Sequence, residues 1–577
     1  RRSSDLRLKT SAVGQRVSLT VVGLRPTILG SIQSVGSLEF GFSSDSVGAP
    51  IFYREVILPF IDAVKDPAQI AWRFGAVSSP TQPPAVLQNL PVCGNCHSFS
   101  QDGSVLGLDV DYANDKGAYA IVKTDKEILL TKDVIMSWAD FRRGDGELTF
   151  GLLSSVSPCG KYVLSTVKDR SVFVPRPDLA FSQLFFPVKG ILVYRDVERG
   201  TIAPLPGADD RAFVNSNPTW SPNGDTVLFT RAKAFTSLGG TSVLLSPEDE
   251  KAFFSGVREF KYDIYKVPFN RGKGGKAVPL EGASHNGMSN YFPRYSPDGK
   301  WIVFCQAANF SLLQPDSRLF MVPASGGTPR LMRCNTSRMN SWHSWSPNGR
   351  WLVFSSKANT PYTQLFLTHV DENGNDTPPI LLEHFTRTDR AANIPEFVNL
   401  PPGAIEVIQE RFVDDHSHFR KGMDQVKVQA FEPAQQSFRT ALALNPRNPE
   451  AHAGLAILLS RQGRIAEAMR HYDSALAIDP HNAAAHYNLA LVYEKEGKLD
   501  SAISHYHRTL ETDSANTEAL NNLGIALVRA GRAAEAEKYF REALRINPSL
   551  DRTRTNLELL LAGKLERALG LHKGPRR

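Results

Sequence analysis

The stretch SWSPNGRWLVFSS, residues 344–356, decides the fold of the larger part of this chain. It places a Pro-Asn-Gly turn between a short strand-like run and an apolar run rich in aromatic and β-branched residues. Proline presets one backbone angle of a turn and glycine accepts a positive one, so the two runs are expected to fold back on each other. The stretch therefore predicts an antiparallel hairpin.

The same motif occurs five times between residues 98 and 349. The other four copies, each followed by an apolar run, are SFSQDG (98–103), SVSPCG (155–160), TWSPNG (219–224) and RYSPDG (294–299). Repeated hairpins of this kind indicate a β-propeller, in which each repeat forms one four-stranded blade. Successive copies lie 57, 64, 75 and 50 residues apart. These long intervals predict loops inserted into the blades.

Five hairpins do not close a ring, and the missing blade is expected where the two ends of the domain meet. IPEFVNLPPG (394–403) resembles the start of a blade without its hairpin, and PIFYREVILPF (50–60) and IAWRFG (70–75) offer strands to pair with it. We therefore expect an all-β propeller over residues 49–411, with six blades or, as the alternative, seven. Residues 1–48 are expected to form a strand-rich extension.

From residue 412 onwards the sequence is helical in character and repeats every 34 residues. Three glycines mark this interval: Gly463, Gly497 and Gly531. The pattern resembles the tetratricopeptide repeat, in which small residues let two antiparallel helices pack closely. We expect an all-α solenoid of about four repeats over 412–551, near residues 416–449, 450–483, 484–517 and 518–551, followed by a capping helix and basic tail over 552–577.

The resemblance to tetratricopeptide repeats implies a concave groove that binds a protein or peptide partner, because solenoids mainly supply binding surfaces. The alternative is a solenoid that only supports the first part of the chain or dimerises it.

The segment LPVCGNCHSFSQDG, residues 90–103, combines a hairpin motif with the spacing of a haem c attachment site. In such a site two thiols three positions apart form thioethers with the haem, and the adjacent histidine binds the iron. Cys93, Cys96 and His97 meet these requirements. Two other interpretations stay open: half of a zinc site, although the sequence has no second Cys-x-x-Cys pair, and a disulfide or free thiol pair beside a hydrogen-bonded His97.

Alignment of the blades on their motif serines supplies candidates for a second iron ligand. His97 lies three positions before Ser100, and His343 lies three positions before Ser346. This part of a blade is expected to line the central channel, so both histidines should lie at the same end of it. His343 is the first candidate for the distal ligand and Met339 is the second. The alternative for His343 is a channel-lining side chain hydrogen-bonded to a neighbouring strand, which would leave a five-coordinate iron.

A weaker metal signal follows directly after the haem motif. DVDYANDKG (109–117) places Asp109, Asp111 and Asp115 close together, and carboxylate oxygens are ligands for calcium. The spacing departs from that of an EF-hand loop, and Asn-Asp-Lys-Gly is also typical of a plain turn. A solvated hairpin turn is therefore the main interpretation and a calcium site the secondary one.

Composition and missing motifs exclude several classes of function. The net charge of +7 is spread along the chain, which does not indicate a nucleic-acid partner. No run of about 18 apolar residues predicts a transmembrane span. The sequence also lacks a Gly-x-Ser-x-Gly nucleophile motif, a Walker loop and a dinucleotide fingerprint. Nothing besides the haem motif suggests catalysis, so the chain is more readily interpreted as a protein without enzymatic activity.

The segments CGNCHSFS and HSWSPNGRWLVFSS, in a propeller that precedes tetratricopeptide repeats, resemble a bacterial family of exported TolB-like proteins with a haem c motif. The resemblance spans most of residues 50–577 and implies a periplasmic or otherwise exported protein with one haem c. The expected function is electron transfer or haem-based sensing within a protein assembly, with a redox partner protein. The alternative is a haem-free TolB-like scaffold that acts only through protein surfaces.

Overall fold

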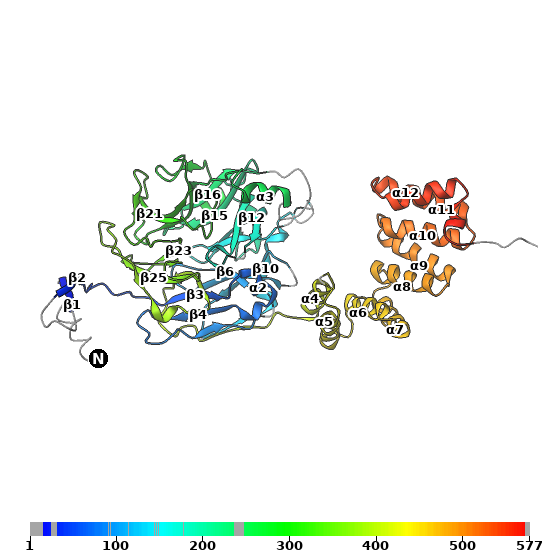
Figure 1. Ribbon diagram of the computed structural model, residues 1–577, viewed down its shortest axis with the longest axis horizontal. Coiled ribbons are helices and arrows are strands. Elements are labelled where there is room, and N and C mark those ends of the chain that lie inside the picture. Colours follow the sequence, from blue (N-terminus) through cyan, green and yellow to red (C-terminus); the bar gives the residue numbers. More distant parts are fainter. Residues whose placement is uncertain are drawn as a thin grey trace, which may run out of the picture. The chain divides into compact units, whose positions relative to one another are not determined.

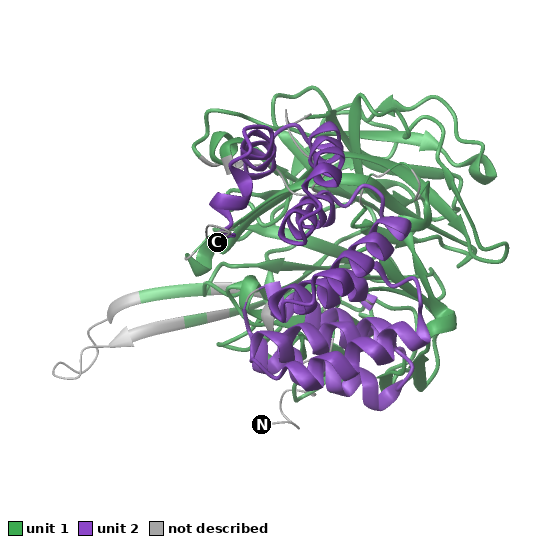
Figure 2. Ribbon diagram, turned by 90° about the vertical axis from the view of Figure 1, so that its right-hand side faces the viewer, with its two compact units in different colours: residues 1–111, 115–411 green, residues 112–114, 412–577 purple. Residues whose placement is uncertain are grey.

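The chain forms two compact units, one made of residues 1–111 and 115–411 and the other of residues 112–114 and 412–577 (Figures 1 and 2). The first unit is rich in β-strands and the second is helical. The computed structural model describes residues 16–24, 32–90, 92, 94–112, 115–142, 145, 147, 149–176, 178–235, 247–427 and 429–571.

Four-stranded antiparallel sheets are the building blocks of the β-rich unit. One sheet has the order β10-β8-β7-β6, with strands β6 Gly94–Phe99, β7 Val105–Val110, β8 Ala118–Lys123 and β10 Ile135–Ser137. Another consists of β19 Ser289–Tyr295, β20 Trp301–Ala307, β21 Arg318–Pro323 and β22 Arg330–Leu331. A third consists of β23 Asn340–Trp345, β24 Trp351–Ser356, β25 Gln364–His369 and β26 Ile380–Leu381.

An eight-stranded sheet follows the first of these along the chain. Its strands are β11 Leu152–Val156, β12 Tyr162–Pro175, β13 Gln183–Asp196, β14 Thr201–Pro204, β15 Phe213–Trp220, β16 Thr226–Lys233, β17 Asp263–Pro268 and β18 Val278–Pro279. Gly190 and Val214 form the parallel bridge that joins β13 to β15. On either side of this bridge lies an antiparallel arrangement of four strands, like that of the other sheets.

The remaining four-stranded sheet joins the two ends of the β-rich unit. Its order is β27-β3-β4-β5, with β3 Ile51–Val56, β4 Ala71–Gly75, β5 Ala85–Leu87 and β27 Ala391–Phe397. Phe397 is paired with Ile51 and Ala391 with Val56. The strand near residue 394 therefore pairs with strands near residue 50, as the sequence predicted.

The motif serine explains why the same turn recurs. In the copy at residues 344–349, the Ser346 hydroxyl donates to Asn348 Oδ1 over 2.6 Å and accepts from the Trp351 backbone N–H over 3.0 Å. The backbone N–H of Gly349, where φ is +69°, donates to the Ser346 carbonyl over 2.8 Å. One hydroxyl thus ties both strands to the turn, and Ser296 accepts from Trp301 in the same way over 3.0 Å.

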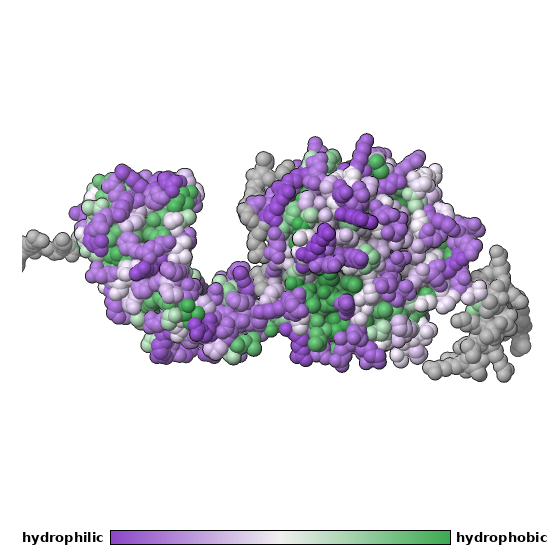
Figure 3. Space-filling model, turned by 180° about the vertical axis from the view of Figure 1, so that it is seen from behind, coloured by the Kyte–Doolittle hydropathy of each residue, from purple (hydrophilic) through white to green (hydrophobic). Residues whose placement is uncertain are grey.

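Apolar layers between neighbouring sheets form the core of this unit. Leu228 and Ile264 of the eight-stranded sheet, for example, pack in one cluster with Ile302 and Phe304 of the next sheet. All four side chains are fully buried. Figure 3 shows a mostly hydrophilic outer surface, with a patch of apolar residues on the β-rich unit.

Several short elements complete the β-rich unit. β9 Glu127–Leu130 and β28 Val407–Glu410 form a parallel pair, and β1 Arg16–Leu24 and β2 Ile32–Gly41 form an antiparallel hairpin within the predicted N-terminal extension. The short helices are α2 Phe60–Lys65, α3 Pro247–Phe254, η1 Pro67–Gln69, η3 Lys132–Val134, η4 Trp138–Asp140, η6 Leu179–Phe181, η7 Asn270–Gly272 and η8 Glu383–Phe385.

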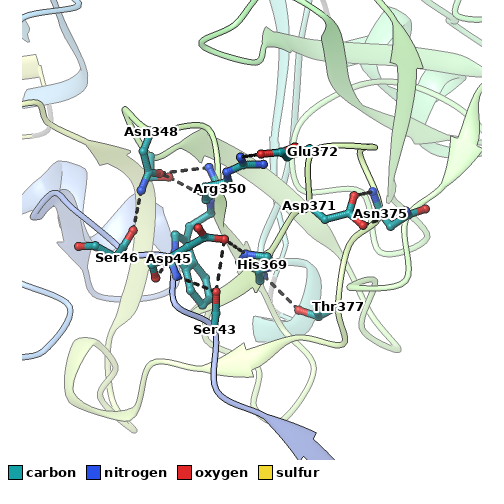
Figure 4. A network of polar contacts seen from close by, with 12 residues as sticks. Ser43, Asp45, Ser46, Asn348, Arg350, His369, Asp371, Glu372, Asn375 and Thr377 are labelled. Atoms are coloured by element: carbon teal, nitrogen blue, oxygen red, sulfur yellow. Dashed lines mark hydrogen bonds and ion pairs between the residues drawn. The ribbon is translucent and has the colours of Figure 1, made fainter. Parts of the chain in front are cut away.

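Residues 43–46 hold the extension to the sheet that contains β24 and β25 (Figure 4). Asp45 Oδ2 accepts a hydrogen bond from His369 Nε2 over 2.6 Å, and this bond is the main reason that the pKa of Asp45 is lowered. Asn348 Nδ2 donates to the Ser46 carbonyl over 2.6 Å. The extension is thus joined to the turn of one predicted blade motif.

The helical unit consists of antiparallel helix pairs. The first two pairs are α4 Asp415–Lys427 with α5 Phe431–Leu444, and α6 Pro449–Arg461 with α7 Ile465–Ile478. The next two are α8 Ala483–Lys495 with α9 Leu499–Thr512, and α10 Thr517–Arg529 with α11 Ala533–Ile546. α12 Asp551–Leu561 and α13 Leu565–Ala568 cover the last pair, where a capping helix was predicted. The tail from residue 572 lies outside the described residues.

Equivalent residues stabilise successive helix pairs. Asn448, Asn482 and Asn516 cap α6, α8 and α10, each accepting a hydrogen bond from a backbone N–H three residues later. Gly524 lets α10 approach the ring of Phe540 in α11. Within the described part of the chain, no helix has the length and apolar character needed to span a membrane.

Candidate functional site

Six strands of the β-rich unit surround one small cavity. They are the first strands of the antiparallel groups described above, namely β6, β11, β15, β19, β23 and β27. The cavity has a volume of about 60 Å³. Two or three consecutive residues of each strand line it: 96–97, 153–155, 217–219, 292–294, 342–344 and 394–396.

A β-bulge places these residues in the cavity wall. The pairing register of every one of the six strands shifts at this point. In five strands a residue other than glycine has a positive φ: Leu153 (57°), Asn217 (52°), Phe292 (51°), Trp342 (40°) and Ile394 (52°). Such a backbone costs on the order of 1–3 kcal/mol per residue and concentrates at functional sites, where bulges re-aim side chains. The bulge is thus a repeated feature of the fold, and its six copies together line one cavity.

The predicted haem motif coincides with this bulge in β6. The register shift lies between Gly94 and His97 and therefore contains Cys96. Cys96 is half-buried, and its backbone N–H donates to Asp109 Oδ2 over 3.0 Å. Burial and then the negative charge of Asp109 raise the pKa of its thiol. Cys93, the other predicted thioether residue, lies outside the described residues.

His97 is buried, and its ring nitrogens make no hydrogen bond of normal geometry within the described part of the chain. Its side chain is 3% exposed, and neither Nδ1 nor Nε2 makes a hydrogen bond with any described residue. The Phe52 ring contacts it edge-on, with ring centroids 4.7 Å apart. Burial, followed by the positive charge of Arg54, lowers the pKa of His97 to about 3, and the nearby backbone carbonyls of Ile394 and Phe52 oppose this shift only weakly. The imidazole is therefore neutral at physiological pH and keeps a free lone pair, as an iron ligand requires.

His343 lines the same cavity, as the blade alignment predicted, but its ring is already hydrogen-bonded. Nε2 lies 3.0 Å from the carbonyl oxygen of Val303, to which it donates, and Nδ1 lies 3.9 Å from Cys305 Sγ. Burial lowers its pKa to about 3. Met339 is 1% exposed and does not line the cavity. His343 shares the cavity with His97, and its Nε2 can bind iron only if the bond to Val303 breaks.

Two half-buried ionisable side chains that the sequence analysis did not single out, Glu396 and Arg294, line the cavity. Glu396 lines it and accepts a hydrogen bond from the Phe99 backbone N–H over 3.1 Å. Burial raises the pKa of Glu396 to about 7, against the opposing effect of Arg294, which lines the same cavity. Burial likewise raises the pKa of Asp109 to about 7. These groups come from different strands, so no local pattern in the sequence marks them as neighbours.

A second, more apolar cavity opens beside Cys96 and has a volume of about 120 Å³. Its walls include the aromatic and aliphatic side chains of Leu58, Phe60, Leu152, Leu153, Phe173, Phe185, Leu312, Leu313, Trp342 and Ile394. Two cationic side chains, Arg54 and Lys357, also line it. Lys357 Nζ donates to the carbonyl groups of Leu179 and Ala180, and burial lowers its pKa to about 8. An apolar wall with cationic groups suits a flat apolar ligand that carries carboxylates.

The side chains at this site meet the chemical requirements of a haem, whereas the cavities are too small to enclose one. A neutral, unpartnered His97 beside Cys96 and an apolar wall matches the requirements of a c-type haem. Pockets that enclose drug-sized ligands measure about 300–1,000 Å³, which exceeds either cavity described above. Apolar side chains at the mouth would have to move to admit a haem.

The three aspartates of the predicted calcium site have separate partners. Asp109 accepts from Cys96, Asp111 pairs with Lys116, and Asp115 accepts from the Gly117 backbone N–H over 2.9 Å. Among the residues that the structure describes, no group of three or more His, Cys, Asp or Glu side chains is placed to hold a metal ion. The local geometry resembles the turn that was the main interpretation of this segment.

Comparison with protein families identifies the helical unit. Models described as tetratricopeptide repeats match residues 427–470, 459–497 and 487–551. The helical unit carries tetratricopeptide repeats. The predicted 34-residue repeat is confirmed over these residues, and the unit supplies a protein-interaction scaffold that follows the propeller-like β-rich unit along the chain.

Solved structures resemble each unit only distantly. TolB from Acinetobacter baumannii is 15% identical, with 61% of this chain and 67% of TolB covered and a TM-score of 0.37. PilF from Pseudomonas aeruginosa is 22% identical, with coverage of 28% and 78% and a TM-score of 0.25, and MamA is 25% identical, with coverage of 24% and 75% and a TM-score of 0.22. A search of curated proteins finds no match. The description of the fold therefore rests on the order of the strands and helices themselves.

Proposed function

We propose that the β-rich unit is an exported six-bladed propeller carrying one haem c, and that the tetratricopeptide repeats dock it to a partner protein. The proposed role is electron transfer, or haem-based sensing, within a protein assembly. The observation that carries the proposal is His97, a buried neutral imidazole whose two nitrogens have no described hydrogen-bond partner, next to Cys96 in a Cys-x-x-Cys-His motif.

Support for six blades comes from the cavity wall. Six strands contribute equivalent residues, and every one of them carries its bulge at the same place. The bridge between Gly190 and Val214 joins two adjacent blades of this ring into one eight-stranded sheet. β27 and β3–β5 form the blade that joins its ends.

Each residue of the site has a defined part in holding the haem. The thiols of Cys93 and Cys96 would add to the vinyl groups of a haem to form the thioethers, and His97 would bind its iron. Arg54 and Lys357 offer positive charge to the carboxylates of the group. A haem held here would supply a metal centre that accepts and releases one electron. His343 is the first candidate for a second iron ligand and Met339 the second, and His343 could serve as one only if its hydrogen bond to the Val303 carbonyl were broken.

The test is expression with a c-type cytochrome maturation system in the bacterial periplasm, followed by a pyridine haemochrome spectrum and the mass of the intact chain. We expect one covalently attached haem per chain. Cys93→Ala/Cys96→Ala should abolish attachment, and His97→Ala should keep the thioethers but change the spin state. Cys159→Ala is the matched control, because this cysteine is exposed and outside the motif. A chain that leaves this system without haem and with free thiols at residues 93 and 96 contradicts the proposal.

A second candidate function is a haem-free scaffold that acts only through protein surfaces. The small cavity volumes and the satisfied ring of His343 favour it. In that case the mass of the chain stays that of the polypeptide, and loss of His97 affects stability only. A haem-free scaffold would transfer no electrons, so no redox partner would be expected.

A further inference from the structure

A larger cavity lies beside the first one in the β-rich unit, on the side of the hairpin turns, and is called the turn-side cavity below. It has a volume of about 220 Å³. The same six strands contribute one residue each to a ring in its wall, two positions before the motif serine or its equivalent in β27: Ser98, Ser155, Thr219, Arg294, Ser344 and Glu396. All of them except Ser98 also line the cavity of about 60 Å³, so the ring lies between the two cavities.

Hydrogen bonds between neighbouring strands explain the small members of this ring. Ser344 Oγ, for example, accepts from the Phe397 backbone N–H of the next strand over 3.1 Å. Glu396 Oε1 makes the same contact with the Phe99 backbone N–H, also over 3.1 Å. A serine hydroxyl is sufficient for this contact, so the contact does not account for the carboxylate at residue 396.

Arg294 differs still more from the other members of the ring, because a guanidinium has no acceptor and cannot make this contact. Within the described residues it makes one hydrogen bond, from Nη1 to Thr219 Oγ1 over 3.4 Å, and no ion pair. Its side chain is half-buried in the wall of the cavity. A guanidinium carries N–H donors in a planar fork that matches the two oxygens of a carboxylate. Most of these donors are therefore available to a ligand.

Arg294 and Glu396 line the same cavity with opposite charges, yet these two described residues form no ion pair with each other. Burial raises the pKa of Glu396 and the charge of Arg294 opposes this rise, so the two groups are close enough to interact. A simple anion on Arg294 would leave the charge of Glu396 without a counterion, and a simple cation on Glu396 would leave that of Arg294 without one. A ligand that carries both charges compensates both side chains.

We propose that the turn-side cavity binds a free α-amino acid as a zwitterion, with its carboxylate on Arg294 and its ammonium group on Glu396. The side chain of the amino acid extends towards the turns, where four prolines and two amides line the cavity: Gln101, Pro158, Pro222, Pro297, Pro347 and Asn399. The volume of about 220 Å³ is below the roughly 300–1,000 Å³ of pockets for drug-sized ligands, which suits a molecule of this size. None of these residues belongs to the haem motif, so the inference goes beyond the function proposed above.

The experiment titrates the full-length chain with each of the twenty protein L-amino acids by calorimetry at pH 7.5. The amino acid that binds most tightly is then compared with its amide, which lacks the carboxylate, and with its N-acetyl derivative, which lacks the ammonium group. We expect one molecule bound per chain. Each derivative should bind at least about tenfold more weakly, because each loses one charge-assisted contact.

Variants assign each charge of the ligand to its partner. Arg294→Gln should bind the amino acid and its amide equally, and Glu396→Gln, which keeps an oxygen for the Phe99 N–H, should bind the amino acid and its N-acetyl derivative equally. Lys300→Gln and Glu406→Gln remove exposed charges of the same unit and are the matched controls, which should bind as the wild type does.

The proposal is overturned if no amino acid binds, or if either derivative binds the wild type as tightly as the free amino acid. The comparison of derivatives needs no substitution, so it stands even if a variant fails to fold. It also does not depend on haem attachment, so a chain without haem that binds an amino acid would contradict the proposed function alone.

Discussion

Asp169 is a buried carboxyl whose ionisation should destabilise the β-rich unit. It lies in β12, is 1% exposed, and accepts hydrogen bonds on Oδ1 from the backbone N–H groups of Phe150 (2.9 Å) and Gly151 (3.4 Å). Its Oδ2 has no partner among the described residues. Burial raises its pKa to about 7 from a model-compound value of 3.8. The folded state therefore favours the protonated carboxyl.

The sign and size of the effect follow from this difference. A pKa that is higher in the folded than in the unfolded chain gives stability that is complete below pH 4 and is lost as the pH rises through about 7. Three pKa units correspond to about 4 kcal/mol, which is an upper bound above pH 7. Asp169→Asn keeps an oxygen for the two backbone donors and cannot ionise. The free energy of unfolding of the Asp169→Asn variant, measured relative to that of the wild type, should therefore be about 2–3 kcal/mol higher at pH 8 than at pH 5.

Tryptophan fluorescence during urea unfolding reports on the β-rich unit alone, because all seven tryptophans lie between residues 72 and 351. Other acids with raised pKa values, such as Glu396, are common to both proteins and cancel in the difference. Ser171→Ala is the matched control, a neutral buried hydroxyl in the same strand whose loss should act equally at both pH values. A difference between Asp169→Asn and wild type that does not change with pH would refute the reasoning.

Two further substitutions test the packing of each unit. A Cβ on Gly524 would lie 2.6 Å from Phe540 Cε1, so Gly524→Ala should destabilise the helical unit by about 1–3 kcal/mol. Circular dichroism at the helix band measures this loss during unfolding. An unchanged unfolding midpoint would contradict close packing between these two helices. Phe397 is 6% exposed in the strand that joins the ends of the β-rich unit, so Phe397→Ala should cost about 3–5 kcal/mol by tryptophan fluorescence. A loss below 1 kcal/mol would mean that this sheet contributes little to stability.

Local chemistry made the hairpins predictable from sequence. Ser346, Asn348 and Gly349 act within one turn, so their effect does not depend on the rest of the chain. The pairing of β27 with β3 was also predictable, because strands without partners remained at both ends. The bulge was not predictable, because Leu153, Asn217 and the other residues with positive φ at that position share no residue type that would mark it in the sequence.

The candidate site was predictable in part, because aligned repeats place equivalent residues at equivalent positions of the fold. His97 and His343 could be assigned to one cavity because they occupy the same position in aligned repeats, and both line it. The hydrogen bond from His343 to Val303 depends on the distance between two strands, which the sequence does not encode locally. Glu396 likewise enters the site only through the register of β27.

The sheet that joins β27 to β3 also governs when the β-rich unit can be completed during synthesis. Ile51 is paired with Phe397, a residue made roughly 350 positions later. At about 5–20 residues per second, the ribosome needs about 20–70 s to produce that partner. During this time the edge of β3 has unpaired backbone groups, a template for association with other chains. The nascent chain therefore exposes the unpaired edge of β3 until residue 397 has emerged.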